Sequence, residues 1–130
     1  MNASNHPHKH RRGLARLRYA FVYSLQGLLA GVRTSPAFRL ELALAGFGFV
    51  LAFLLGRNWL EVVFLLAVLV LVLIVEMLNC GIEAAIDRVG FEIHPLSKLA
   101  KDYGSAAVFL SLVLCAGVWL SLLCVRLVAY

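Results

Sequence analysis

The chain has 130 residues, of which 62% are hydrophobic and only 15% are charged, and its mean hydropathy is +0.90. This composition excludes an ordinary soluble domain and predicts a small integral membrane protein. The net charge is +5, but the basic residues flank apolar segments and do not alternate with stacking aromatic side chains. Anionic lipid headgroups are therefore the simpler counter-charge, and no nucleic-acid partner is expected.

The N-terminal part divides into two segments. Residues 1–12 are predicted to form a disordered basic tail, and residues 13–130 a single membrane domain. From about residue 13 to residue 33, apolar residues recur at helical spacing, with Arg16 and Tyr23 among the interruptions. This pattern predicts an amphipathic helix that lies in the membrane interface and is too polar to span it.

Three later stretches reach the length of about 20 residues that a membrane-spanning helix needs, at about 38–56, 59–78 and 105–125. The first two are joined by only Gly56-Arg57-Asn58, which makes them antiparallel neighbours. The second continues as a helix to about residue 88, and a polar elbow that contains Pro95 leads to the third. The expected fold class is an all-α integral membrane protein with one surface helix and three transmembrane helices.

The basic residues also predict the orientation in the membrane. Of the 12 Lys and Arg residues, all but Arg57 and Arg126 precede the first span or lie between the second and the third. The positive-inside rule then places the N-terminus and the elbow in the cytoplasm.

The three cysteines, Cys80, Cys115 and Cys124, show none of the spacings of a zinc site or of a disulfide framework. We therefore interpret them as small apolar packing residues.

A polar stripe interrupts the most apolar segment of the chain. At about 100° per residue, Glu76, Asn79, Glu83 and Asp87 fall within an arc of about 80° on one helix face. The stripe begins inside the membrane and ends beyond it. A charged side chain at membrane depth costs about 2.5 to 3.5 kcal/mol or more, so it requires a partner, a cavity or a function.

The chemistry of this stripe suits phosphoryl transfer at a membrane surface. Mg²⁺ typically takes one or two carboxylates together with phosphate oxygens, and Lys98 and Lys101 complement a nucleotide's phosphates. Glu76, at the edge of the hydrocarbon, is placed to remove a proton from a lipid hydroxyl. Two other readings stay open: polar side chains that join packed helices, and a protein that moves protons or ions.

The segment "VEMLNCGIEAAIDRVGFEIHPLSKLAKDYGSAAV", with "FRLE" and "YSLQGL" before it, resembles the bacterial integral-membrane diacylglycerol kinases and the related undecaprenol kinases. The resemblance covers roughly residues 16 to 120. It implies a homotrimer in the bacterial cytoplasmic (inner) membrane, with composite active sites at protomer interfaces. The implied reaction transfers the γ-phosphoryl group of ATP to the hydroxyl of diacylglycerol and depends on Mg²⁺.

The resemblance also implies roles for individual residues. Glu76 matches the catalytic base, and with Asn79 and Ser105 it matches the positions beside the lipid substrate. Glu83 matches a carboxylate that binds metal and ATP. The remaining matches are nucleotide contacts, two from the surface helix and five from the elbow: Arg16, Tyr23, Glu92, Ile93, His94, Lys101 and Asp102.

One position departs from the family pattern. Ser35 stands where the family usually has a second metal-binding Glu, and Glu41, about 9 Å further along a helix, is a possible substitute. The motif does not identify the lipid, so an undecaprenol or other lipid-alcohol kinase is the alternative among enzymes. Outside the enzymes, the alternative is a non-catalytic transport or structural oligomer with Glu76 as a buried proton site.

Overall fold

The computed structural model of the chain describes residues 13–90, 92 and 94–128. Its regular elements are four helices, α1 (Leu14–Thr34), α2 (Pro36–Leu55), α3 (Trp59–Val89) and α4 (Pro95–Val128). Helices α2, α3 and α4 are each long and apolar enough to cross a membrane. The all-α fold with three candidate spans is therefore confirmed. The predicted tail and Ile93 lie outside the described residues.

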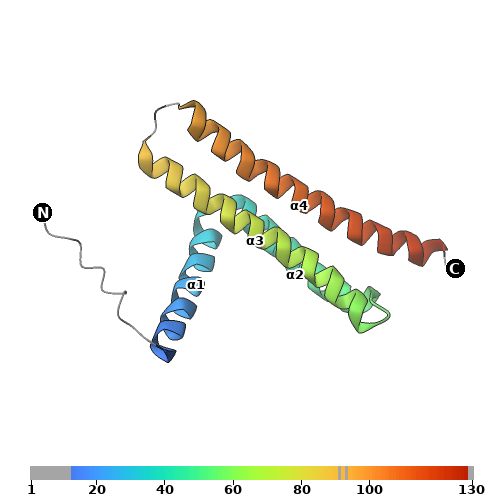
Figure 1. The fold of residues 1–130 in the computed structure, drawn as a ribbon. Coiled ribbons are helices and arrows are strands. Elements are labelled where there is room, and N and C mark those ends of the chain that lie inside the picture. The colour runs from blue at the N-terminus through green and yellow to red at the C-terminus, as the bar shows by residue number, and fades with distance from the viewer. Residues whose placement is uncertain (1–12, 91, 93, 129–130) are drawn as a thin grey trace, which may run out of the picture.

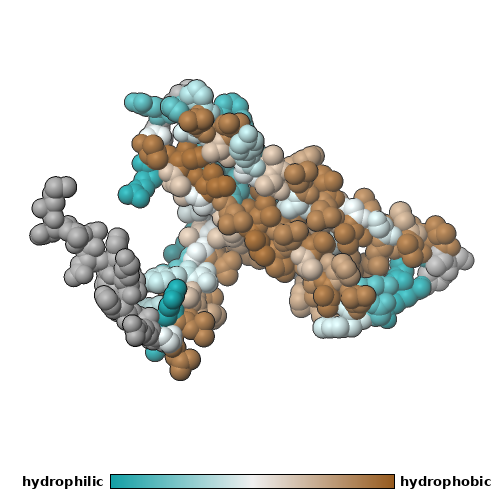
Figure 2. All heavy atoms as spheres, viewed as in Figure 1, coloured by the Kyte–Doolittle hydropathy of each residue, from teal (hydrophilic) through white to brown (hydrophobic). Residues whose placement is uncertain are grey.

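Helix α3 is the centre of the arrangement (Figure 1). Helices α2 and α3 run antiparallel, α4 lies along α3, and α1 leaves the other three at a steep angle. We call the end of the bundle that carries residues 56–58 the hairpin end, and the end that carries residues 90–94 the elbow end. Figure 2 shows apolar side chains over the middle of the bundle and hydrophilic ones gathered at both ends. This distribution suits a helical bundle that spans a bilayer.

Local signals set the helix boundaries. The Ser35 hydroxyl accepts a hydrogen bond from the backbone N–H of Phe38 at 3.0 Å, and the Asn58 side-chain oxygen accepts one from the N–H of Glu61 at 3.0 Å. Both residues are therefore N-caps, of α2 and α3 respectively. Helix α3 ends at Gly90, whose φ of 156° is one that residues with a Cβ rarely adopt.

The buried face of α3 extends from apolar residues into the polar stripe. Its buried residues recur every three or four positions, which places them on one side of the helix. They are Val62, Leu65, Val68, Val72, Glu76 and Asn79. Glu76 and Asn79 thus occupy positions where the same helix face elsewhere carries core side chains, and both point into the bundle.

Helix α4 packs against Asn79 of α3 through a glycine. A Cβ atom at Gly104 would overlap the side-chain oxygen of Asn79. Small residues allow two membrane helices to pack with their backbones close together. The third span, expected over about 105–125, lies inside one continuous helix that begins at Pro95, so the elbow is reduced to a few residues.

Candidate functional site

Glu76 is the most deeply buried carboxylate of the polar stripe, with 3% of its surface exposed. The Ser35 hydroxyl donates a hydrogen bond to its Oε1 atom at 3.1 Å, and the Cys80 thiol donates to the same oxygen at 3.6 Å. Ser35 comes from the start of α2 and Cys80 from the next turn of α3. Ser35, the residue that departs from the family pattern, therefore lies beside the predicted base.

Two further polar side chains near Glu76 have an unsatisfied atom. Among the described residues, no hydrogen-bond partner reaches the buried Oε2 of Glu41 or the buried Oδ1 of Asn79. The carboxylate of Glu41 is close enough to Glu76 for their charges to interact. An unpaired buried acceptor costs about 1 to 3 kcal/mol, and such atoms are candidates for contacts with a ligand.

Glu83 lies two helical turns beyond Glu76, where α3 is exposed. Its Oε1 accepts a hydrogen bond from the Asn79 side-chain amide at 3.4 Å. The described part of the chain contains no group of three or more His, Cys, Asp or Glu side chains arranged to hold a metal ion. Mg²⁺ needs only one or two protein carboxylates when phosphate oxygens and waters supply the remaining ligands. Glu83 fits a magnesium ion of that kind.

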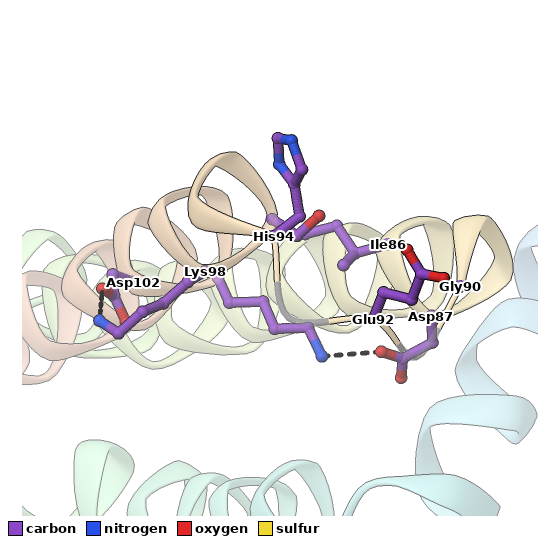
Figure 3. A pocket seen from close by; sticks show the side chains of 9 residues that line it. Ile86, Asp87, Gly90, Glu92, His94, Lys98 and Asp102 are labelled. Carbon is purple, nitrogen blue, oxygen red and sulfur yellow. Dashed lines mark hydrogen bonds and ion pairs between the residues drawn. The ribbon is translucent and has the colours of Figure 1, made fainter.

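A cleft of about 330 Å³ opens at the elbow end, between the last turns of α3 and the first turns of α4. Figure 3 shows it with most of its side chains labelled. We call it the elbow cleft. It brings together four of the predicted nucleotide contacts, and its lining consists of Ile86, Asp87, Gly90, Glu92, His94, Ser97, Lys98, Lys101 and Asp102.

Two exposed ion pairs lie along the elbow cleft. Lys101 Nζ is 2.7 Å from Asp87 Oδ1, and Lys98 Nζ is 2.5 Å from Asp102 Oδ2. Lys101 precedes the apolar segment of α4, and its hydrogen bond to the Asp87 carboxylate raises its pKa, so its ammonium group stays charged. Because exposed ion pairs contribute little net free energy, both lysines are able to exchange their carboxylates for an incoming phosphate.

His94 holds the beginning of α4. Its Nδ1 accepts a hydrogen bond from the backbone N–H of Leu96 at 3.2 Å, which satisfies a donor of the first helical turn. In Figure 3 the His94 ring stands away from the two ion pairs. Glu92 also lines the cleft, but it takes part in neither of the two ion pairs described there.

Three of the described residues predicted for the site, Arg16, Tyr23 and Ser105, belong neither to the polar stripe nor to the elbow cleft. Arg16 and Tyr23 are exposed on α1, which contacts α2 and α3 but, within the described residues, not α4. Ser105 is exposed on α4, and no hydrogen bond between it and Glu76 occurs in the described part of the chain. A single copy of the chain therefore assembles part of the predicted site and leaves these three residues apart from it.

Two residues near the site were not singled out from the sequence. Cys80, interpreted as a packing residue, donates to Glu76. Its position four residues after Glu76 on a helix is a signal that was present, because such pairs are neighbours on one helix face. Gly104 gave no signal of its own, since its importance depends on a contact with another helix.

The polar stripe connects two different environments. From Glu76 to Asp87 there are 11 residues, or about 16 Å along α3. One end is a buried carboxylate among apolar residues, and the other is the charged, open elbow cleft. Such a site is able to receive a membrane-bound reactant at Glu76 and a soluble phosphate compound from the elbow cleft.

Comparison with known proteins gives consistent matches. The sequence model of the family described as prokaryotic diacylglycerol kinase matches residues 22–123. A diacylglycerol kinase of Pseudomonas aeruginosa is 46% identical over 117 residues, which cover 90% of this chain and 95% of the relative. The diacylglycerol kinase of Haemophilus influenzae is 41% identical over 82% of this chain and 91% of its own length. That of Escherichia coli strain K12 is 40% identical over 85% and 91% respectively.

Proposed function

Since the chain belongs to the prokaryotic diacylglycerol kinase family, we propose that it transfers the γ-phosphoryl group of ATP to the hydroxyl group of diacylglycerol. The product is phosphatidate. The observation that carries the proposal is the polar stripe of α3, which begins at the buried Glu76 and ends in the elbow cleft. A lipid substrate and a soluble nucleotide are thereby able to meet on one helix.

Glu76 is the general base of this reaction. It takes the proton of the diacylglycerol hydroxyl while the oxygen of that hydroxyl forms a bond to the γ-phosphorus and the bond to ADP breaks. This role is supported by the burial of Glu76 and by its hydrogen bonds, which in the described part of the chain come from the neutral donors Ser35 and Cys80. Asn79 and Ser105 line the path of the lipid headgroup, and the side-chain amide of Asn79 is directed toward Glu83 by its hydrogen bond.

The elbow cleft binds the nucleotide. Lys101, with Lys98 beside it, exchanges its carboxylate partner for phosphate oxygens, while Glu92, His94 and Asp102 line the rest. Ile93, in the same loop, belongs to this set by its place in the family motif. Arg16 and Tyr23 contact the nucleotide in the elbow cleft of a neighbouring copy, because α1 has no contact with its own α4 among the described residues.

Glu83 would hold a magnesium ion through its carboxylate. When bound, this ion would supply positive charge that offsets the negative charge of the phosphoryl group being transferred. The position of Glu83 between Glu76 and Asp87 on the same helix face supports the assignment. Glu41 remains the alternative carboxylate for a second ion.

The chain is a homotrimer in the bacterial inner membrane, with its N-terminus and elbow in the cytoplasm. The concentration of basic residues before α2 and around the elbow supports this orientation. Maleimide labelling tests it in intact cells, with a single cysteine introduced at Asn58 or Glu92 in a protein whose Cys80, Cys115 and Cys124 are replaced by serine. Only the Asn58→Cys protein should react with an impermeant reagent. Sedimentation in detergent with matched density measures the number of copies.

A lipid panel tests the reaction directly. The purified protein is incubated with Mg²⁺ and ATP in mixed micelles that contain diacylglycerol, undecaprenol or neither. Phosphatidate should form at a rate well above the rate of phosphorylation of undecaprenol. Phosphorylation of undecaprenol alone would overturn the choice of substrate, and the absence of any lipid phosphorylation would overturn the kinase assignment.

A further inference from the structure

The hydroxyl of Ser35 has two hydrogen bonds at once. It accepts from the backbone N–H of Phe38 at 3.0 Å, which caps α2, and it donates to Oε1 of Glu76 at 3.1 Å. The first contact fixes the oxygen at the end of a helix. The second directs the hydroxyl proton across to α3, 41 residues further along the chain.

The backbone of Ser35 is held as firmly as its side chain. Its N–H donates to the carbonyl oxygen of Gly31 at 2.9 Å, and its carbonyl oxygen accepts from the N–H of Arg39 at 3.2 Å. The guanidinium group of Arg39 in turn donates to the carbonyl oxygen of Val32 at 3.1 Å. Each backbone polar group of Ser35 is thus engaged, so the hydroxyl cannot turn away from Glu76 without losing the cap of α2.

Both donors to Glu76 reach the same oxygen. Ser35 and Cys80 contact Oε1, and no residue in the described ranges donates a hydrogen bond to Oε2. A carboxylate with one oxygen held in this way keeps a single rotamer and presents the other oxygen to whatever enters the site. A thiol is a weak donor, so the hydroxyl is the stronger of the two constraints.

We propose that Ser35 is a positioning residue for Glu76, which holds Oε1 so that Oε2 receives the proton of the lipid hydroxyl. Position 35 in this chain therefore acts on the base and not on a metal ion. The inference rests on the proposed kinase function, but it concerns position 35, where this chain departs from the pattern of its family. Cys80 is the weaker second donor in the same arrangement.

Steady-state kinetics of three variants test the proposal, with ATP, diacylglycerol and Mg²⁺ each varied. Ser35→Ala should lower kcat about tenfold or more, because a hydrogen bond to a charged group is lost. The KM values for ATP and diacylglycerol and the Mg²⁺ requirement should stay within about twofold. Ser35→Thr keeps the hydroxyl and should restore kcat to within about threefold of the original. Asn58→Ala removes the equivalent cap of α3 without any contact with Glu76, and it should leave kcat unchanged.

A second pair of variants at position 35 separates the effect of capping α2 from the effect of donating a hydrogen bond to Glu76. Asn and Gly are both accepted at N-caps, but only Asn also offers a side-chain donor to Glu76, and neither adds a charge beside it. Ser35→Asn should therefore have a kcat at least about fivefold above that of Ser35→Gly, with similar thermal stability. Cys80→Ala should lower kcat by about two- to threefold, and Cys80→Ser should not.

Several results would overturn this inference while the kinase assignment stands. They are an unchanged kcat in Ser35→Ala, equal kcat values for the Asn and Gly variants, or a loss of activity in Ser35→Ala that excess Mg²⁺ restores. The last result would indicate that position 35 takes part in metal binding. By contrast, an original protein with no activity on any lipid would contradict the proposed function itself.

Discussion

Helix α3 carries two carboxylates, Glu61 and Glu76, that are paired in different ways. At the hairpin end, Glu61 Oε2 contacts the guanidinium group of Arg126 and accepts from the backbone N–H of Arg57 at 2.9 Å. In the middle of the helix, Glu76 accepts hydrogen bonds only from a hydroxyl and a thiol, and no Lys or Arg in the described ranges forms an ion pair with it.

The difference fits a structural role for Glu61 and the proposed role of Glu76 as the base. Arg126 also donates to the carbonyl oxygen of Leu55, so the Glu61 pair joins α4 to the turn between α2 and α3. A carboxylate neutralised by a guanidinium group in this way is a poor proton acceptor. Glu76 is more deeply buried, yet none of the described Lys and Arg side chains pairs with it, which leaves its carboxylate able to accept a proton.

The sharpest test of this contrast substitutes each carboxylate by its amide. Glu76→Gln should lower kcat by about 10²- to 10⁴-fold, since the base is lost, and leave the oligomer and the helical circular dichroism unchanged. Glu61→Gln should keep kcat within about twofold. Full activity of Glu76→Gln would remove Glu76 as the base.

Glu83→Gln tests the middle of the polar stripe. The Mg²⁺ concentration for half-maximal activity should rise by about 10-fold or more, because an amide is a weaker ligand for a hard cation. The KM for diacylglycerol should not change. Titrations of activity against Mg²⁺ for this variant and for Glu61→Gln make the comparison, and identical curves would contradict metal binding at Glu83.

Gly104→Ala tests the contact between α3 and α4 at the elbow end. The new methyl group collides with the Asn79 oxygen, which should lower activity about tenfold and destabilise the fold by about 1 to 3 kcal/mol. Gly117→Ala is the matched control on the same helix, because its Cβ would meet no atom within 4 Å. Equal behaviour of the two variants in activity and thermal unfolding would show that the close approach is unimportant.

Arg126→Met tests the hairpin end. The melting temperature should fall by about 5 °C, because the Glu61 carboxylate loses its cation, while kcat below the transition should be unchanged. Thermal unfolding in detergent provides the measurement. A loss of kcat without a loss of stability would mean that the hairpin end also takes part in the reaction.

Lys101→Met should have the smallest effect, a rise of about three- to fivefold in the KM for ATP at an unchanged kcat. Because the contact with Asp87 raises the pKa of Lys101, its positive charge is present at neutral pH and is lost only above its ordinary alkaline range. The KM of the original protein for ATP should therefore show no step due to Lys101 between pH 6 and pH 9. A step in that range that disappears in Lys101→Met would contradict this assignment.

The sequence by itself determined the helices and the polar stripe. Apolar periodicity, the caps at Ser35 and Asn58 and the stop at Gly90 are local, so they act within a few residues of where they stand. The face shared by Glu76 and Asn79 follows from the helical repeat alone.

Only the tertiary structure decided what the polar residues contact. Ser35 and Glu76 are 41 residues apart, and Arg126 and Glu61 are 65 apart, so each contact depends on how two helices are placed side by side. From the sequence, Ser35 was only a missing carboxylate. Its hydrogen bond to Glu76 exists because the start of α2 packs against α3 at the depth of the base, and no local pattern encodes that depth.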